Sequence, residues 1–201
     1  MKKRRVLSVV LAASMFAMLL TGCGGGNQGS AEGSQAAAIG QGVAEAESCI
    51  KIGVSGTPDL DPAIVNTGSS LIAAINIYDT LIFPSNEADE GVIPRVAEDW
   101  TISEDGLTYT FNLKKGIKFH NGDELTASDV VYSMDRLLTI GEGYAYIFTS
   151  YVEPGTTVAV DDYTVEFHLK QAYGPFINAL VRLYILNEDE VKANTQSAGN
   201  Y

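Results

Sequence analysis

Residues 94–136 read PRVAEDWTISEDGLTYTFNLKKGIKFHNGDELTASDVVYSMDR, and the pattern of apolar side chains in this stretch decides the fold around it. Apolar and polar residues alternate over 100–102 and again over 107–113, with the turn-forming residues 103–106 between them. Alternation with period two places one face of a strand in the core, and a Gly-containing loop joins neighbouring strands. The first part of the stretch therefore predicts a β-hairpin.

The second part of the same stretch predicts a helix. Thr126 and Asp129 have the spacing of a capping box, in which two side chains satisfy backbone N–H groups at the helix start. The helix that follows has one apolar face, which we expect to be buried, made of Val130, Val131, Met134, Leu137 and Leu138.

Towards the C-terminus the pattern predicts a second hairpin and another helix. Residues 158–160 and 163–169 alternate on either side of Asp161 and Asp162. Residues 175–186 carry apolar side chains at helical spacing, namely Phe176, Ala179, Leu180, Leu183 and Tyr184. Residues 187–201 are polar and lack the stop signal of a finished domain.

Towards the N-terminus, residues 50–54 alternate and predict a strand, and two prolines indicate a loop over 57–62. Ser69 or Ser70 is expected to cap a helix that Pro84 ends. Its apolar face would contain Leu71, Ala74, Ile75, Tyr78, Leu81 and Ile82. The order strand, helix, hairpin, helix, hairpin, helix indicates an α/β or α+β chain.

The first 22 residues are predicted to be a lipoprotein signal peptide. Four basic residues, 2–5, precede the apolar run 6–20, which is shorter than the roughly 20 residues of a membrane-spanning helix. Leu20-Thr-Gly-Cys23 resembles the bacterial lipobox, in which the Cys thiol is acylated before cleavage. The alternatives are an ordinary signal peptide with a chance Cys and an uncleaved anchor. Several acyl chains, such as palmitate, on Cys23 would hold the protein at the cell membrane, facing the extracellular or periplasmic side.

Residues 23–49 are rich in Gly, Ala, Ser and Gln and predict a flexible tether, which leaves 50–201 as the folded part. Once Cys23 carries lipid, Cys49 has no partner for a disulfide within the chain. The net charge of −12 argues against nucleic acid and against electrostatic docking on anionic lipid.

The whole of 94–136 resembles the family 5 extracellular solute-binding proteins, the oligopeptide-, dipeptide- and nickel-binding receptors of ABC importers. Their shared pattern is approximately P-x-L-A-x-x-W, then D-G-L-x-Y-x-F-x-L-R-x-G-V-K-F-H-x-G, then L-T-A-x-D-V-x-x-S. The departures are mild: Val96 replaces Leu, Lys114 replaces Arg and Ile117 replaces Val. Residues 53–63, 158–169 and 186–194 also resemble successive segments of the family.

The resemblance implies a type II periplasmic-binding-protein-like α/β fold with two lobes that close on a solute around a hinge. This chain is less than half as long as family members, so it resembles only lobe one and its β-hairpin subdomain, without the second lobe. Peptides are the implied solute, with nickel, haem or a sugar as alternatives, and an ABC permease in the membrane is the implied partner. In the family, charged groups that fix a peptide's termini come largely from the second lobe, so we expect weak affinity from this portion alone.

Ligand contact is expected near the predicted helix start. In the family, the loop after the first strand and the start of the next helix face the cleft. Here Thr67, Gly68, Ser69 and Ser70 would offer hydroxyl and backbone N–H groups at a helix N-terminus, which favours an anionic group such as a peptide carboxylate. The alternative is that Ser69 or Ser70 serves only as the N-cap.

Catalytic and metal chemistry are not expected, and neither is a cofactor. His120, Asp123 and Glu124 invite a metal or acid–base interpretation, but a metal site needs three or four suitably spaced ligands, and the only other His is His168. His120 is expected instead to bond a turn. No Gly-x-Ser-x-Gly motif is present, and the glycines at 24–26 lie in the tether. The rival hypothesis for function is a truncated surface lipoprotein that acts as a protein-interaction module or has no function.

Overall fold

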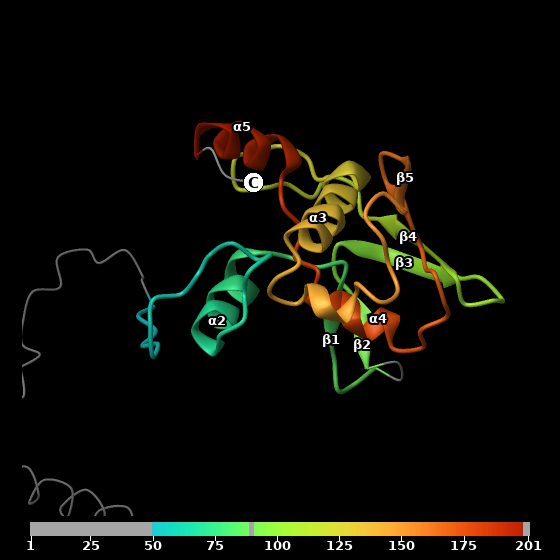
Figure 1. Ribbon diagram of the computed structural model, residues 1–201, viewed down its shortest axis with the longest axis horizontal. Helices are drawn as coiled ribbons and strands as arrows, with labels where there is room; N and C mark the ends of the chain where they lie inside the picture. The colour runs from blue at the N-terminus through green and yellow to red at the C-terminus, as the bar shows by residue number, and fades with distance from the viewer. Residues whose placement is uncertain (1–49, 89–90, 199–201) are drawn as a thin grey trace, which may run out of the picture. The chain divides into compact units, whose positions relative to one another are not determined.

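A computed structural model describes residues 50–88 and 91–198 (Figure 1). The predicted signal peptide, the predicted tether and both cysteines lie outside the described residues. The described chain falls within one compact unit, Lys51–Tyr201, apart from Ile50. Within these residues, no helix has the length and apolar character needed to cross a membrane.

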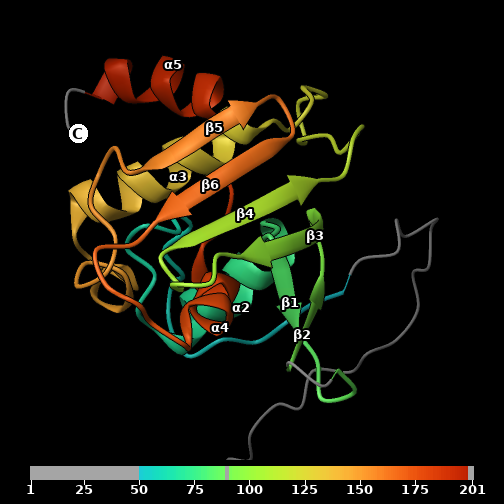
Figure 2. The same cartoon turned by 90° about the vertical axis from the view of Figure 1, so that its right-hand side faces the viewer.

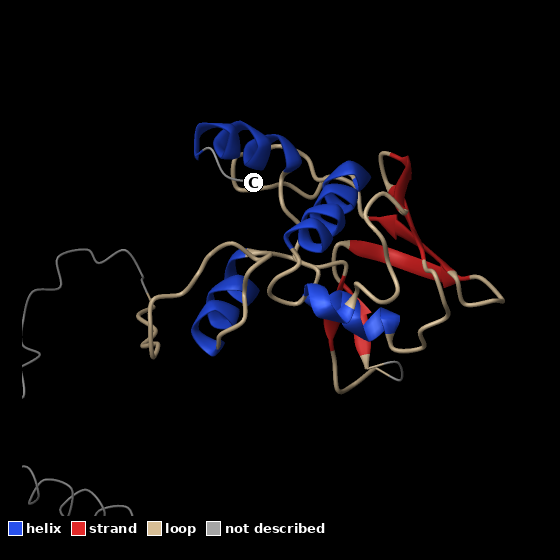
Figure 3. Cartoon of the chain, viewed as in Figure 1, coloured by secondary structure: helices blue, strands red, loops and turns tan. Residues whose placement is uncertain are grey.

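The described chain contains both helices and strands (Figure 3). In chain order they are α2 (Gly68–Ile77), β1 (Ile82–Pro84), β2 (Val92–Pro94), β3 (Ala97–Ile102), β4 (Thr108–Leu113), α3 (Ala127–Ile140), the 3-10 helix η1 (Ala145–Ile147), β5 (Thr157–Asp161), β6 (Thr164–His168), α4 (Phe176–Ala179), the 3-10 helix η2 (Leu180–Arg182) and α5 (Glu188–Ala198).

The two predicted hairpins are confirmed, and they join into one antiparallel sheet in the order β3-β4-β6-β5 (Figure 2). The first hairpin turns at Gly106, whose φ of 68° lies in the left-handed region that glycine adopts without strain. The central pair places Phe111 opposite Val165, so the apolar sides of β4 and β6 share one face. A separate two-stranded sheet pairs β1 with β2.

A layer of aromatic rings fills the space between the sheet and the helices. Phe111, Phe167 and Phe176 are all buried, and Phe167 meets Phe111 and Phe176 edge to face at ring distances of 5.7 and 5.6 Å. Such pairs add about 0.5–1.5 kcal/mol each beyond the burial of their surface. The predicted buried face of α3 is also confirmed: Val130, Met134, Leu137 and Leu138 are buried, and Val131 is partly buried against the same core.

Asp129, which belongs to the predicted capping box, caps the start of α3 and also contacts the start of α5. Asp129 is 6% exposed, and its Oδ2 accepts a hydrogen bond of 2.9 Å from the backbone N–H of Thr126. Its Oδ1 accepts one of 2.9 Å from the N–H of Glu188, at the start of α5. The Asn187 side chain accepts from the N–H of Glu190, so a polar cap that the sequence analysis did not interpret begins α5.

The prediction of a strand over 50–54 is wrong. This segment has no regular structure, and its apolar side chains are exposed: Ile50 90%, Ile52 60% and Val54 41%. A strand needs a partner for its backbone N–H and C=O groups, and no described strand pairs with this one.

Two of the predicted helices are too long, because residues at their ends pair with distant parts of the chain instead of continuing the helix. α2 ends at Ile77, since Thr80 forms a bridge with Tyr184 and Ile82 belongs to β1. The helix predicted over 175–186 is only α4 followed by η2, since the chain becomes extended at Leu183 to reach that bridge. The expected apolar face of α2 is also imperfect, because Ile75 is 50% exposed.

The dual role of Asp129 predicts a large loss of stability in Asp129→Ala. Two backbone N–H groups at separate helix starts lose their acceptor, so we expect about 2–4 kcal/mol less free energy of unfolding. Asp129→Asn keeps one acceptor oxygen and should lose about half as much. Urea denaturation followed by circular dichroism measures both.

Asp189→Ala is the matched control, because Asp189 is an exposed acid in the first turn of α5. We expect it to change the free energy of unfolding by no more than about 0.5 kcal/mol. Equal losses for Asp129→Ala and Asp189→Ala would contradict the bridging role of Asp129.

Candidate functional site

The predicted ligand-contact residues lie together at the start of α2, but their hydroxyl groups are engaged inside the protein. Thr67 is the N-cap, with extended backbone at φ −112° and ψ 157°, and its Oγ1 accepts a bond of 3.2 Å from the N–H of Ser70. The expectation that Ser69 or Ser70 caps the helix is therefore wrong. The helix begins at Gly68, and both serines lie within its first turn.

Ser69 and Ser70 are buried and hold the preceding loop against α2. Ser70 Oγ accepts a hydrogen bond of 2.9 Å from the N–H of Asp59 and lies 2.8 Å from Thr67 Oγ1. Ser69 Oγ lies 3.3 Å from Ser55 Oγ. The groups left at the surface of this helix start are the exposed Thr67 and Gly68. Contact between these four residues and a ligand stays a prediction.

The loop before α2 is also fixed by an ion pair that the sequence analysis did not find. The guanidinium of Arg136, on α3, donates from Nη1 and Nη2 to the two carboxylate oxygens of Asp61 at 2.7 and 2.6 Å. The Arg136 side chain is 10% exposed and that of Asp61 is 27% exposed. The hydroxyl of Tyr78 donates to the carbonyl of Leu60 at 2.8 Å.

The electrostatics of this contact favour the ionised form of Asp61. Burial opposes the charged form, but the hydrogen bonds from Arg136 and from the N–H of Ala63, with the positive charge of Arg136, outweigh it. Together they hold the pKa of Asp61 below its usual 3.8. Burial, and then the charge of Asp61, raise the pKa of the Tyr78 hydroxyl above its usual 10.

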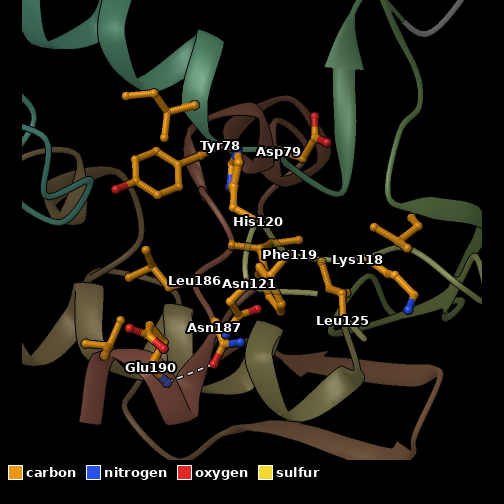
Figure 4. Close-up of a pocket in the computed structure, with 14 residues that line it drawn as sticks. Tyr78, Asp79, Lys118, Phe119, His120, Asn121, Leu125, Leu186, Asn187 and Glu190 are labelled. Atoms are coloured by element: carbon orange, nitrogen blue, oxygen red, sulfur yellow. Dashed lines mark hydrogen bonds between the residues drawn. The ribbon is translucent and has the colours of Figure 1, made fainter. Parts of the chain in front are cut away.

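A cavity of about 380 Å³ opens at the other end of α2 (Figure 4). Its walls are the residues after α2, the turn 117–121 and the start of α5, and they are mainly apolar, with Phe119, Leu125 and Leu186 among them. The ten residues of α2 span about 15 Å. The cavity and the Thr67–Ser70 group are therefore distinct places on this chain.

Three polar side chains on the cavity rim bond to residues that lie beside the cavity. Asn121 and Asn187 both donate to Asp123 Oδ2, at 2.6 and 2.9 Å. Asp79 pairs with Arg95 at 2.7 Å. The two bonds to Asp123 tie the turn to the start of α5.

His120 lies exposed on the same rim, near Tyr78 and Asp79 (Figure 4). The bonds of its turn run instead through neighbouring residues, with the N–H of Phe119 donating to the Asp123 carbonyl at 2.9 Å. That His120 itself bonds the turn stays a prediction. His168 lies apart on β6, where its ring contacts Thr108. In the part of the chain that the structure describes, no three His, Cys, Asp or Glu side chains gather to hold a metal ion.

The site residues that sequence reasoning missed are Arg136 and Tyr78, which hold the loop before α2. Arg136 lies 75 residues from Asp61, and no local pattern pairs such distant residues.

Residues 91–200 match the family described as bacterial extracellular solute-binding proteins, family 5 Middle. The chain is 36% identical over 141 residues to the dipeptide-binding protein of Escherichia coli K12, covering 61% of this chain and 26% of that protein. It is 32% identical over 136 residues to di/tripeptide-binding protein 1 of Pseudomonas aeruginosa, covering 60% of this chain and 25% of that protein.

Solved structures of peptide-binding receptors have the same fold over this part of the chain. The Helicobacter pylori periplasmic binding protein DppA, in complex with the peptide STSA, superposes with a TM-score of 0.58 at 32% identity, over 69% of this chain and 30% of that one. Listeria monocytogenes OppA bound to peptide gives 0.60 at 28% identity, over 68% and 30%. The chain thus spans about a quarter of the length of the curated relatives it matches.

The ion pair with Arg136 predicts how stability depends on pH. The pKa of Asp61 is lowered by folding, so the pair stabilises the protein above the unfolded value of 3.8, and this contribution is lost as the pH falls through the folded pKa. We expect Asp61→Asn to lower the free energy of unfolding by about 1–3 kcal/mol at pH 7. Urea denaturation of both proteins across pH 3–7 measures the difference.

The difference between the two proteins should be constant above about pH 5 and shrink below the usual pKa of the carboxyl. Asp79→Asn is the control, because its pair with Arg95 is exposed by about half on both sides. A difference for Asp61→Asn that persists undiminished at pH 3 would contradict the role of the charge.

Proposed function

We propose a function for this chain on the basis that it belongs to family 5 of the bacterial extracellular solute-binding proteins. It is the N-terminal portion of the substrate-binding component of an ABC importer for peptides. The single observation that carries the proposal is the match of residues 91–200 to the family, continuous with the hairpins and α3 of the fold. Peptides are the proposed solute because relatives over 30% identical bear the names dipeptide- and di/tripeptide-binding protein.

The proposed activity is binding without chemistry. The receptor would hold a peptide between two lobes, of which this chain supplies part of the first, and deliver it to a membrane permease. The contact surface on this chain would be the start of α2, where the exposed Thr67 and Gly68 stand at the positive end of the helix dipole. A peptide carboxylate is the group that such an end favours.

The proposal includes a lipid anchor on Cys23, after removal of residues 1–22. The basic residues, the short apolar run and Leu20-Thr-Gly-Cys23 support it. The segment 23–49 would then tether the folded part outside the membrane. Because the receptor would be anchored in the same membrane as the permease, it would stay close to it.

The anchor predicts that Cys23→Ser carries no fatty acid and keeps residues 1–22. A thiol is required for acylation, and acylation precedes cleavage, so this variant should remain an uncleaved precursor. Cys49→Ser is the matched control and should be acylated and cleaved as the unaltered chain is. Labelled palmitate and the size of the product on an immunoblot measure the two steps, and equal labelling of Cys23→Ser and the unaltered chain would exclude the lipid anchor on Cys23.

Peptide binding is tested with the purified chain and a pool of random tripeptides, by saturation-transfer difference NMR. We expect weak, saturable binding with a dissociation constant of about 1 mM, because one part of a cleft desolvates only one side of the ligand. A pool amidated at the C-terminus should bind several-fold more weakly if the helix start holds a carboxylate.

A pair of variants at the N-cap makes the test specific. Thr67→Ala should weaken binding, whereas Thr67→Ser keeps the hydroxyl and should bind as the unaltered chain does. Thermal unfolding of each variant, recorded in parallel, separates loss of the cap from loss of the ligand. Equal binding of free and amidated pools would contradict the carboxylate contact, and no saturable binding of either pool would contradict the function proposed for this chain.

A further inference from the structure

The segment between Thr57 and Ala63, which we name the approach loop, has no regular secondary structure, yet hydrogen bonds hold it at 59–61. The N–H of Asp59 donates to Ser70, the carbonyl of Leu60 accepts from Tyr78, and the Asp61 carboxylate accepts from Arg136. A loop held by so many side chains of neighbouring helices has a fixed shape. Its shape is set by α2 and α3 and not by its own backbone pairing.

The strongest of these bonds is the one made by Arg136. Both terminal nitrogens of its guanidinium meet both oxygens of Asp61, at 2.7 and 2.6 Å, and the Arg side chain is only 10% exposed. Two parallel charge-assisted bonds fix direction as well as distance. A lysine ammonium would supply the charge but not the two-pronged geometry.

The same carboxylate also shapes the end of the loop. Asp61 Oδ1 accepts a bond of 3.0 Å from the N–H of Ala63, and the Asp61 carbonyl accepts one of 3.2 Å from the N–H of Ile64. Asp61 thus closes the turn that precedes α2, and Arg136 on α3 holds the carboxylate of Asp61 in place. A shift of Asp61 would therefore move both the approach loop and the chain entering the helix.

The contacts continue to the N-cap. Asp59 is bonded to Ser70, whose Oγ lies 2.8 Å from the Oγ1 of Thr67. The backbone of residues 59–61 joins these contacts to the pair that Asp61 forms with Arg136 on α3. The position of α3, which the core fixes, is transmitted to the surface where Thr67 and Gly68 are exposed.

We propose that Arg136 is a positioning residue for solute binding: through Asp61 it holds the approach loop, and with it the start of α2, in the shape that receives the ligand. The proposal rests on the function proposed above. Arg136 does not touch the ligand in this scheme. Its substitution should loosen the approach loop locally and weaken peptide binding, while the sheet beneath stays intact.

The test compares Arg136→Lys, Asp61→Asn and the control Asp79→Asn by hydrogen exchange read out by mass spectrometry on the full chain. Asp79 forms a similar pair with Arg95, but on an exposed surface outside the approach loop. We expect amides of residues 59–64 to exchange about tenfold faster in the first two variants, since a charge-assisted bond is lost. Amides of β4 exchange by global unfolding, so they should accelerate only as far as the lowered free energy of unfolding of each variant requires, and Asp79→Asn should match the unaltered chain.

The binding arm uses the same variants with the tripeptide pool. Weaker binding in Arg136→Lys and Asp61→Asn, with faster exchange at 59–64, supports the positioning role. Acceleration in β4 beyond what the measured loss of unfolding free energy requires, unchanged exchange at 59–64, or a loosened loop with undiminished binding would each overturn it. If the unaltered chain binds no peptide, the proposed function fails, while the exchange data still decide whether Arg136 holds the loop. If Arg136→Lys does not fold, Asp61→Asn, which keeps the shape of the side chain, decides alone.

Discussion

The ring contacts of Phe111, Phe167 and Phe176 are the packing on which the other features depend, because they join the sheet to α4 and lie in the core that α3 covers. Burying each phenyl ring stabilises the fold by about 1.5–3 kcal/mol. Once this core sets the position of α3, the polar residues of that helix reach defined partners. Arg136 meets the approach loop, and Asp129 meets the start of α5.

The hairpins and α3 could be predicted from sequence because their signals are local. Phe111 and Phe167 stand on the buried sides of strands with regular alternation, and Thr126 with Asp129 marks the start of α3 in the sequence itself. The end of α2 and the length of α4 could not be predicted in the same way. Both depend on the bridge between Thr80 and Tyr184, two residues that lie far apart in the chain.

The segment 50–54 illustrates the limit of a periodic pattern. Its alternation of apolar residues is typical of a strand, but a strand exists only where another strand satisfies its backbone groups. In the candidate site, too, local features could be predicted and contacts between distant elements could not. Thr67 to Ser70 could be located from residue type and helix spacing, whereas their internal bonds to Ser55 and Asp59 and the support from Arg136 arise only when separate elements pack together. The family resemblance, carried by residues 94–136, identified the fold more fully than the local patterns did.

The most direct measurement is the mapping of amide chemical-shift changes in a ¹⁵N-labelled chain titrated with the tripeptide pool. Binding at the start of α2 predicts the largest changes at residues 57–70, saturating together with the ligand signal. Changes centred instead on residues 117–121 and 187–191, around the cavity at the other end of α2, would contradict it.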